Sequence, residues 1–235
     1  LHVDGAYGAA AAVVPEMAHV LDGLEMADSF VMNPHKWLFT PIDCSAFYVR
    51  RPELLQQAFS LVPEYLKTAE SGVTNYMDWG VQLGRRFRAL KLWMVFRAFG
   101  RQGIAARLRE HIRLGQQLAG WIDADPDFER LAPTPLSVVC FRAAPRDIRR
   151  RLASAGPQEA IELESDLDRL NESVLDAVNA SGQAFLSPTR LRGRYTIRLA
   201  IGNIRTDEAH VRRIWNLLRK TAKEAGDRGS GIGDR

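Results

Sequence analysis

Two short apolar segments that each end in polar residues constrain the fold of this chain most. Residues 1–4 read Leu-His-Val-Asp, and residues 28–32 form a second predicted strand, which runs directly into Asn-Pro-His-Lys at residues 33–36. Open α/β sheets place ligand-binding groups at the carboxyl ends of their strands. We therefore expect an α/β fold in which Asp4 and the residues after Met32 serve one site.

The rest of the chain continues the alternation of helix and strand. Apolar spacing predicts helices at residues 52–60, 84–99, 100–121, 163–178 and after Thr206, and strands at 44–49, 136–142, around Phe185 and at 195–201. Residues 62–79 have a turn-like composition and are predicted to form a surface loop. A polar break at residues 123–127 predicts two domains, residues 1–121 and 122–225, and the glycine- and charge-rich residues 226–235 predict a disordered tail.

Composition excludes several classes of protein. The net charge is only +4, and the short arginine clusters of the chain are typical of solvated helix faces. We therefore expect no nucleic-acid partner. Cys44 and Cys140 form no CxxC pair, and the histidines have no ligand spacing, which favours a reduced, cytoplasmic protein without a metal site. No segment has the length of a membrane span and no signal peptide opens the chain. Because Leu1 falls inside a predicted strand, we expect the chain to be the C-terminal part of a longer protein.

Lys36 and Asp4 are the residues that suggest a chemistry. A lysine beside apolar residues loses its charge more easily, so the Lys36 amine could form a Schiff base with the aldehyde of pyridoxal 5'-phosphate. A carboxylate at Asp4 could hold the protonated ring nitrogen of that cofactor and make the ring an electron sink. The alternatives are a surface lysine and a turn aspartate.

Four more residues are candidates for the same site. Ala6 is small enough for a cofactor ring to lie against the backbone, Asn33 could bind the phosphate, and His35 could contact cofactor or substrate. Tyr76, in the predicted loop, could deliver a proton to a carbanion. Each also has a structural interpretation: a tight turn for Ala6, a turn asparagine, a structural histidine and a surface tyrosine.

Several motifs in the same order resemble one known family. They are His2-Val3-Asp4-Gly5-Ala6-Tyr7-Gly8, Ala27-Asp28-Ser29-Phe30, Asn33-Pro34-His35-Lys36-Trp37, Asp43-Cys44-Ser45-Ala46, Gly84-Arg85-Arg86-Phe87-Arg88 and Arg198-Leu199-Ala200-Ile201-Gly202-Asn203. Together they resemble the group II pyridoxal-phosphate-dependent amino acid decarboxylases, and most of all the aromatic L-amino-acid decarboxylases. The similarity extends from Leu1 to about Leu218.

This resemblance implies a fold, a reaction and a partner. The fold would be the aminotransferase-like type I fold: the C-terminal part of a large α/β domain, then a small C-terminal α/β domain. Lys36 would be the Schiff-base lysine, Asp4 the partner of the ring nitrogen, and Tyr76 the proton donor of the catalytic loop. The activity would be that of a carboxy-lyase, working as a cytoplasmic homodimer on an aromatic amino acid.

The resemblance leaves two alternatives. An aromatic aldehyde synthase uses the same site but consumes oxygen, and a phenylalanine at the loop tyrosine is associated with that activity, so Tyr76 favours decarboxylation. The family's N-terminal segment and the first half of its large domain have no counterpart here, although they hold part of the cofactor site. A catalytically silent, dimerising fragment or pseudoenzyme is therefore the second alternative.

Overall fold

The computed structural model describes residues 1–60 and 74–230, with side chains described up to residue 227. Most of the predicted loop at 62–79 therefore lies outside the described residues. The chain divides into two compact units, Leu1–Ala106 and Arg107–Arg235, and the boundary in the sequence falls within one long helix. The predicted boundary at residue 121 refers to the large and small domains of the type I fold, and it stays a prediction.

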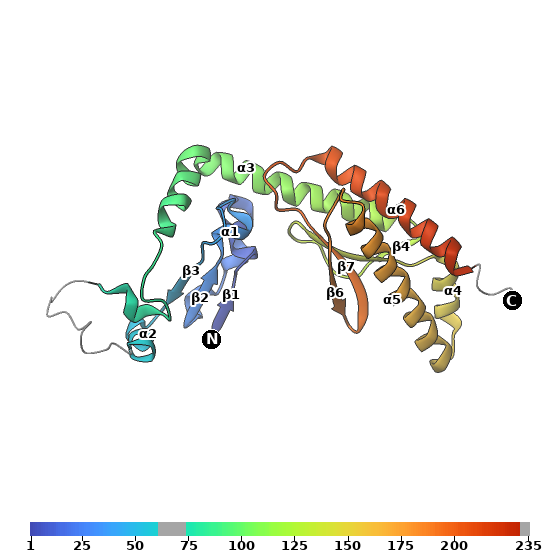
Figure 1. The fold of residues 1–235 in the computed structure, drawn as a ribbon, viewed down its shortest axis with the longest axis horizontal. Coiled ribbons are helices and arrows are strands. Elements are labelled where there is room, and N and C mark those ends of the chain that lie inside the picture. The colour runs from blue at the N-terminus through green and yellow to red at the C-terminus, as the bar shows by residue number, and fades with distance from the viewer. Residues whose placement is uncertain (61–73, 231–235) are drawn as a thin grey trace. The chain divides into compact units, whose positions relative to one another are not determined.

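The first unit is built on a three-stranded sheet in the order β1-β2-β3 (Figure 1). Strands β1 (His2–Asp4) and β2 (Ser29–Met32) are parallel, and β3 (Ala46–Val49) is antiparallel to β2. These are the three strands predicted from the sequence, each shorter by one or two residues. Strand β1 is not buried: His2 and Asp4 are exposed and Val3 is half-buried.

Small residues let the chain between β1 and β2 pack closely on the sheet. It forms three 3₁₀ helices, η1 (Gly8–Val13), η2 (Pro15–Leu21) and η3 (Leu24–Met26). Three alanines of η1, residues 9–11, are buried. A Cβ atom at Gly5 would lie 2.5 Å from the Phe30 ring and 2.9 Å from the Cβ of Ala9, so glycine is required there. The small-residue run is thus used for packing.

Further helices belong to this unit. They are the single turn α1 (Pro34–Trp37), α2 (Pro52–Phe59), the 3₁₀ helix η5 (Tyr76–Trp79) and the start of α3 (Arg88–Ala124). Gly100, which the sequence indicated as a break, interrupts α3 with a φ of +62°. In the segment of α3 before Gly100, Trp93 and Met94 are 56% and 54% exposed. The apolar residues of this segment have the spacing of a core-facing helix, yet they are not buried in the single chain.

The second unit has a four-stranded antiparallel sheet in the order β4-β5-β7-β6. Its strands are β4 (Phe128–Arg130), β5 (Val138–Ala143), β6 (Ser187–Leu191) and β7 (Arg194–Ala200), and its helices, besides the end of α3, are α4 (Arg146–Ser154), α5 (Pro157–Ala180) and α6 (Glu208–Ser230). The end of α3, α5 and α6 bury one face of the sheet in a single apolar core. This is the small α/β domain that the sequence predicted.

Several details of this unit differ from the prediction. Strand β4 and helix α4 were not predicted, and Phe185 is 87% exposed and precedes β6. Asp207 caps α6, because its Oδ1 accepts the backbone N–H of His210 at 2.9 Å. Helix α6 continues through residues 226–230 of the predicted tail, and residues 231–235 lie outside the described part.

Candidate functional site

The carboxyl ends of the two parallel strands meet at one edge of the first unit's sheet. The backbone N–H of Gly5 donates to the Val31 carbonyl at 2.9 Å, and that of Asn33 donates to the Ala6 carbonyl at 3.0 Å. The pairing of β1 and β2 thus continues past both strands. It brings the segment that follows Asp4 against the segment that leads to Lys36, as the sequence predicted.

Asp4 is the last residue of β1, and its side chain is exposed. One carboxylate oxygen accepts the backbone N–H of Ala6 at 2.9 Å, which turns the chain sharply after the strand. A bound ligand can reach this carboxylate from solvent. Ala6 itself is half-buried in the turn, with only a methyl group as its side chain.

Lys36 lies on the single turn α1, which follows Asn33. Its backbone N–H donates to the Asn33 carbonyl at 2.9 Å. The next two residues anchor the turn, since Trp37 and Leu38 are 0% and 2% exposed and the Trp37 ring stacks on Tyr7 with centroids 4.6 Å apart. Lys36 is exposed. The apolar residues after it therefore point into the core and do not surround its amine, contrary to the environment expected from the sequence.

His35 is held by the backbone of Cys44. Its Nδ1 lies 2.6 Å from the Cys44 carbonyl oxygen and 3.1 Å from the Cys44 nitrogen. Two acceptor atoms would repel each other at 2.6 Å, so we infer that Nδ1 carries the proton and donates to the carbonyl. In the neutral ring, Nε2 then has a lone pair and can accept a hydrogen bond or a proton.

Asn33 also has a partner from the same segment. The hydroxyl of Ser45 donates to its Oδ1 at 2.6 Å. Sequence reasoning assigned no role to Ser45 or to the Cys44 backbone, because these contacts join residues nine and twelve positions apart through the fold. Only the motif Asp43-Cys44-Ser45 drew attention to them.

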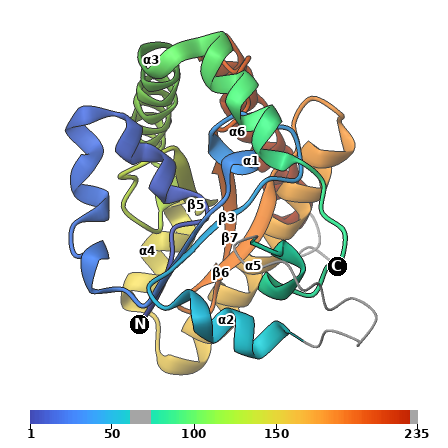
Figure 2. The same ribbon diagram turned by 90° about the vertical axis from the view of Figure 1, so that its left-hand side faces the viewer.

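Tyr76 is not near the other candidates in the single chain. Helix η5 lies beside α2, at the end of the sheet away from α1 (Figures 1 and 2). The Tyr76 ring is 63% exposed and tilts against Trp79, with centroids 6.5 Å apart. Asp4, Ala6, Asn33, His35 and Lys36 are therefore brought together, whereas Tyr76 is separate from them.

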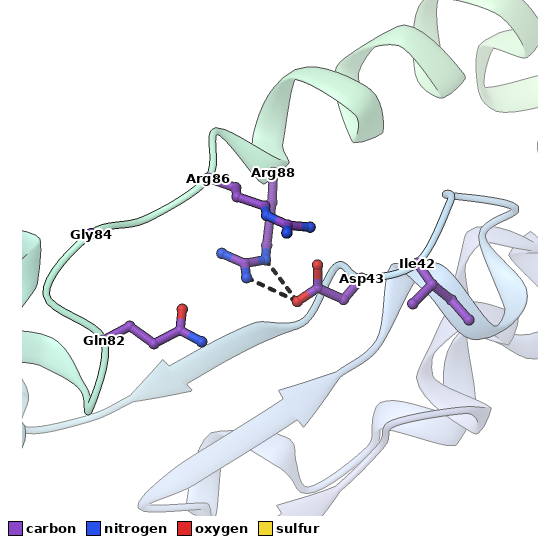
Figure 3. A pocket seen from close by; sticks show the side chains of 6 residues that line it. All are labelled: Ile42, Asp43, Gln82, Gly84, Arg86 and Arg88. Atoms are coloured by element: carbon purple, nitrogen blue, oxygen red, sulfur yellow. Dashed lines mark hydrogen bonds and ion pairs between the residues drawn. The ribbon is translucent and has the colours of Figure 1, made fainter.

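An open pocket of about 500 Å³ adjoins the segment that holds His35 and Asn33 (Figure 3). Its lining residues are Ile42, Asp43, Gln82, Gly84, Arg86 and Arg88. Arg88 donates from Nε and Nη2 to the same Asp43 oxygen, at 2.9 Å each. Hydrogen bonding to Arg88 holds the pKa of the Asp43 carboxyl below its usual value. None of the predicted site residues lines this pocket.

Neither a metal-binding cluster nor a membrane-spanning helix is found in the described part of the chain. Residues 1–60 and 74–230 contain no group of three or more His, Cys, Asp or Glu side chains placed to hold a metal ion. None of the helices within those ranges is long and apolar enough to cross a membrane.

Comparison with known proteins identifies relatives of the chain. The profile described as the pyridoxal-dependent decarboxylase conserved domain matches residues 1–144. Aromatic-L-amino-acid decarboxylase of Sus scrofa is 40% identical over 95% of the chain and 42% of its own length. Phenylacetaldehyde synthase of Arabidopsis thaliana is 40% identical over 94% of the chain and 43% of its length. Among solved structures, Oryza sativa TDC with PLP and tryptamine has a TM-score of 0.81 at 37% identity, over 95% of this chain and 44% of that one.

These matches have one common limit. Each covers nearly all of this chain, yet the chain spans less than half the length of each relative. Activity, substrate and partners of the whole relatives are therefore properties that this chain has to be tested for.

Proposed function

Because the chain belongs to the pyridoxal-dependent decarboxylase family, we propose that it provides the lysine half of a site that decarboxylates an aromatic L-amino acid with pyridoxal 5'-phosphate. One observation carries this proposal: an exposed amine, an exposed carboxylate and an amide follow two parallel strands at one sheet edge. Lys36, Asp4 and Asn33 are these residues.

The donor set fits the cofactor. Pyridoxal 5'-phosphate, when bound, offers an aldehyde to amines and a ring that accepts the electron pair left by departing carbon dioxide. Lys36 supplies the primary amine that would hold the aldehyde carbon, and its exposure leaves that amine accessible. Asp4 supplies the carboxylate that would keep a proton on the ring nitrogen.

The remaining residues would bind and orient. Ala6, beside Asp4, leaves room for a flat ring against the backbone, and the Asn33 amide would donate to the phosphate. His35, held through Nδ1 by the Cys44 carbonyl, would present Nε2 to the ligand as an acceptor. Lys36, whose exposed amine would hold the cofactor, would be placed to act as a base whenever that amine is not attached.

The first experiment measures the visible absorbance of the full chain as it is titrated with pyridoxal 5'-phosphate. We expect saturable binding with an absorbance band that the Lys36→Ala variant lacks. Lys220→Ala is the matched control, because Lys220 is an exposed lysine of α6 that pairs with Glu224. A band that persists in Lys36→Ala, or disappears in Lys220→Ala, would contradict the assignment.

The second experiment identifies the reaction. A decarboxylase releases the amine and carbon dioxide, whereas an aldehyde synthase consumes oxygen and releases peroxide and ammonia. We expect amine without peroxide from aromatic amino acids. Peroxide and ammonia in proportion to product would favour the aldehyde synthase, an alternative that the similarity to phenylacetaldehyde synthase supports. Binding without any product would favour the catalytically silent fragment.

For Tyr76 we propose proton donation to the substrate carbon, as the family resemblance implies. Because η5 lies apart from α1 in one chain, a second copy of the chain or a displacement of η5 would have to deliver it. The test compares Tyr76→Phe with Tyr65→Phe, the other tyrosine of that predicted loop. A loss of amine formation in Tyr76→Phe alone supports the role of Tyr76, and a loss in Tyr65→Phe alone transfers it to Tyr65.

We also propose that the chain forms a cytoplasmic homodimer. The support is the exposed apolar surface of the first part of α3 and the residues before it, since monomers rarely expose large apolar patches. Its most exposed members are Val81, Leu83, Phe87, Trp93 and Met94. Sedimentation at increasing concentration tests this: Trp93→Asp should give a monomer where the unaltered chain gives a dimer. Equal masses would contradict the proposal.

A further inference from the structure

The side chain of Asn33 is in an unusual position for its place in the chain. Asn33 precedes α1 as its N-cap residue, and asparagine at that position usually caps its own helix through Oδ1. Here it makes no side-chain cap hydrogen bond. Its Oδ1 instead accepts the hydroxyl hydrogen of Ser45 at 2.6 Å.

This contact determines which end of the amide is available. The amide has one acceptor, Oδ1, and a donor group, Nδ2 with two hydrogens. With Oδ1 on Ser45, the donor group is the end that points elsewhere. A donor of that kind suits an anion, whereas the reversed amide would present an oxygen and repel one.

Ser45 itself is held in place by the residues before it. Cys44 is only 4% exposed, and its carbonyl oxygen accepts hydrogen bonds from the backbone N–H of His35 at 3.3 Å and from His35 Nδ1 at 2.6 Å. Asp43 is fixed by two hydrogen bonds from Arg88, the residue at which α3 begins (Figure 3). Residues 43–45 therefore form an anchored segment, here called the 43–45 strap, that contacts both His35 and Asn33.

We propose that Ser45 is a positioning residue, which orients the Asn33 amide so that its N–H groups face the phosphate of the bound cofactor. This inference rests on the function proposed above. It adds Ser45, a residue to which no contact with the cofactor is assigned. Its consequence is specific: Ser45 should matter for ligands with the phosphate and not for those without it.

The experiment compares two ligands, pyridoxal 5'-phosphate and pyridoxal, in titrations of the full chain followed by absorbance. Ser45→Ala should bind pyridoxal 5'-phosphate about three- to tenfold more weakly, the range expected from one hydrogen bond, with pyridoxal affinity unchanged. Ser45→Thr, which keeps a hydroxyl, should restore the affinity. Ser45 is exposed, so neither change disturbs a core.

A double-mutant cycle completes the test. Asn33→Ala should weaken phosphate-ligand binding, and adding Ser45→Ala to it should have no further effect, because the two residues would act as one unit. Ser154→Ala, an exposed serine whose hydroxyl bonds to its own helix α4, should leave both affinities unchanged.

Three results would overturn the inference. They are equal losses for the two ligands, additive losses in the cycle, and no loss in Ser45→Ala while the unaltered chain binds normally. If the unaltered chain binds neither ligand, the proposed function fails and this inference fails with it.

Discussion

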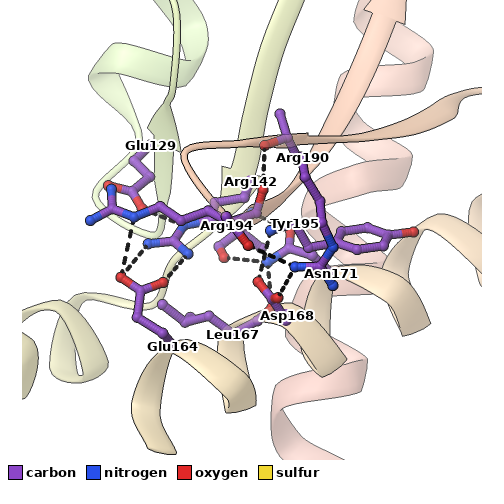
Figure 4. Close-up of polar contacts among 12 residues, drawn as sticks. Glu129, Arg142, Glu164, Leu167, Asp168, Asn171, Arg190, Arg194 and Tyr195 are labelled. Carbon is purple, nitrogen blue, oxygen red and sulfur yellow. Dashed lines mark hydrogen bonds and ion pairs between the residues drawn. The ribbon is translucent and has the colours of Figure 1, made fainter. Parts of the chain in front are cut away.

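Arg142 provides a stability prediction in which the direction of the effect is not obvious (Figure 4). This residue of β5 has a side chain that is 2% exposed. Its Nε donates to Glu129, and its Nη1 and Nη2 donate to the two oxygens of Glu164 at 2.5 and 3.3 Å. Burial alone would lower the pKa of Arg142, but the hydrogen bonds with Glu164 and Glu129 outweigh it and hold this pKa above the usual value.

The two ends of this network differ in their access to water. The side chains of Glu129 and Glu164 are 24% and 29% exposed, and Glu164 has a second partner in Arg194, at 3.3 Å. In Arg142→Met, the glutamates can turn to solvent while methionine fills the buried space, so we expect a loss of about 1 kcal/mol. In the double variant Glu129→Gln/Glu164→Gln, the guanidinium stays buried without a counter-charge, and the expected loss is about 3–5 kcal/mol.

Urea denaturation followed by circular dichroism measures both losses as midpoint shifts at an unchanged m-value. Asp166→Asn is the control, because it removes the exposed ion pair with Arg169 and should change stability by less than about 0.5 kcal/mol. The reasoning is refuted if Arg142→Met loses as much stability as the double glutamine variant.

Three further predictions concern packing, pH and the strap. Gly5→Ala should lose about 1–3 kcal/mol of stability, because its Cβ would lie 2.5 Å from the Phe30 ring. In the same urea assay, the control Gly84→Ala should lose less than about 0.5 kcal/mol, because no atom lies within 4 Å of its Cβ. Burial lowers the pKa of His111, although a backbone hydrogen bond at Asn203 opposes this shift. The unfolded chain therefore binds the proton more readily, and the free energy of unfolding should fall as the pH drops below about 6.5. Denaturation across pH should show a flatter slope in His111→Asn and an unchanged slope in the control His19→Asn. Arg88→Gln should let the pKa of Asp43 rise toward its usual value, which an NMR titration measures. It should also loosen the 43–45 strap and weaken binding of pyridoxal 5'-phosphate. An unchanged affinity would show that Arg88 is not needed to hold the strap.

Much of the first unit can be predicted from the sequence because its strands are short apolar runs bounded by polar residues. Because each of the first two predicted strands ends in polar residues, the sequence is enough to place Asp4 and Asn33 at one sheet edge. Lys36 is placed at this edge for the same reason, although the environment predicted for its amine is wrong. The apolar residues after Lys36 are visible in the sequence, but they do not tell which way the lysine points.

The contacts that hold the site in place cannot be predicted in the same way. Ser45 reaches Asn33, and Cys44 reaches His35, only because the chain turns back after α1. The sequence does not indicate the exposure of Trp93, because an apolar helix face has the same pattern whether it packs within one chain or against another molecule. Arg142 likewise has charged partners from β4 and α5, which no spacing in the sequence indicates.

The most direct test of the account is to locate the covalent attachment of the cofactor. The full chain is incubated with pyridoxal 5'-phosphate, reduced with borohydride, digested and analysed by peptide mass spectrometry. The account predicts one stoichiometric label on Lys36, within the peptide that contains Asn33 to Trp37, and its loss in Lys36→Ala. A label spread over several surface lysines, or one that persists in Lys36→Ala, would contradict the claim that this sheet edge is a pyridoxal site.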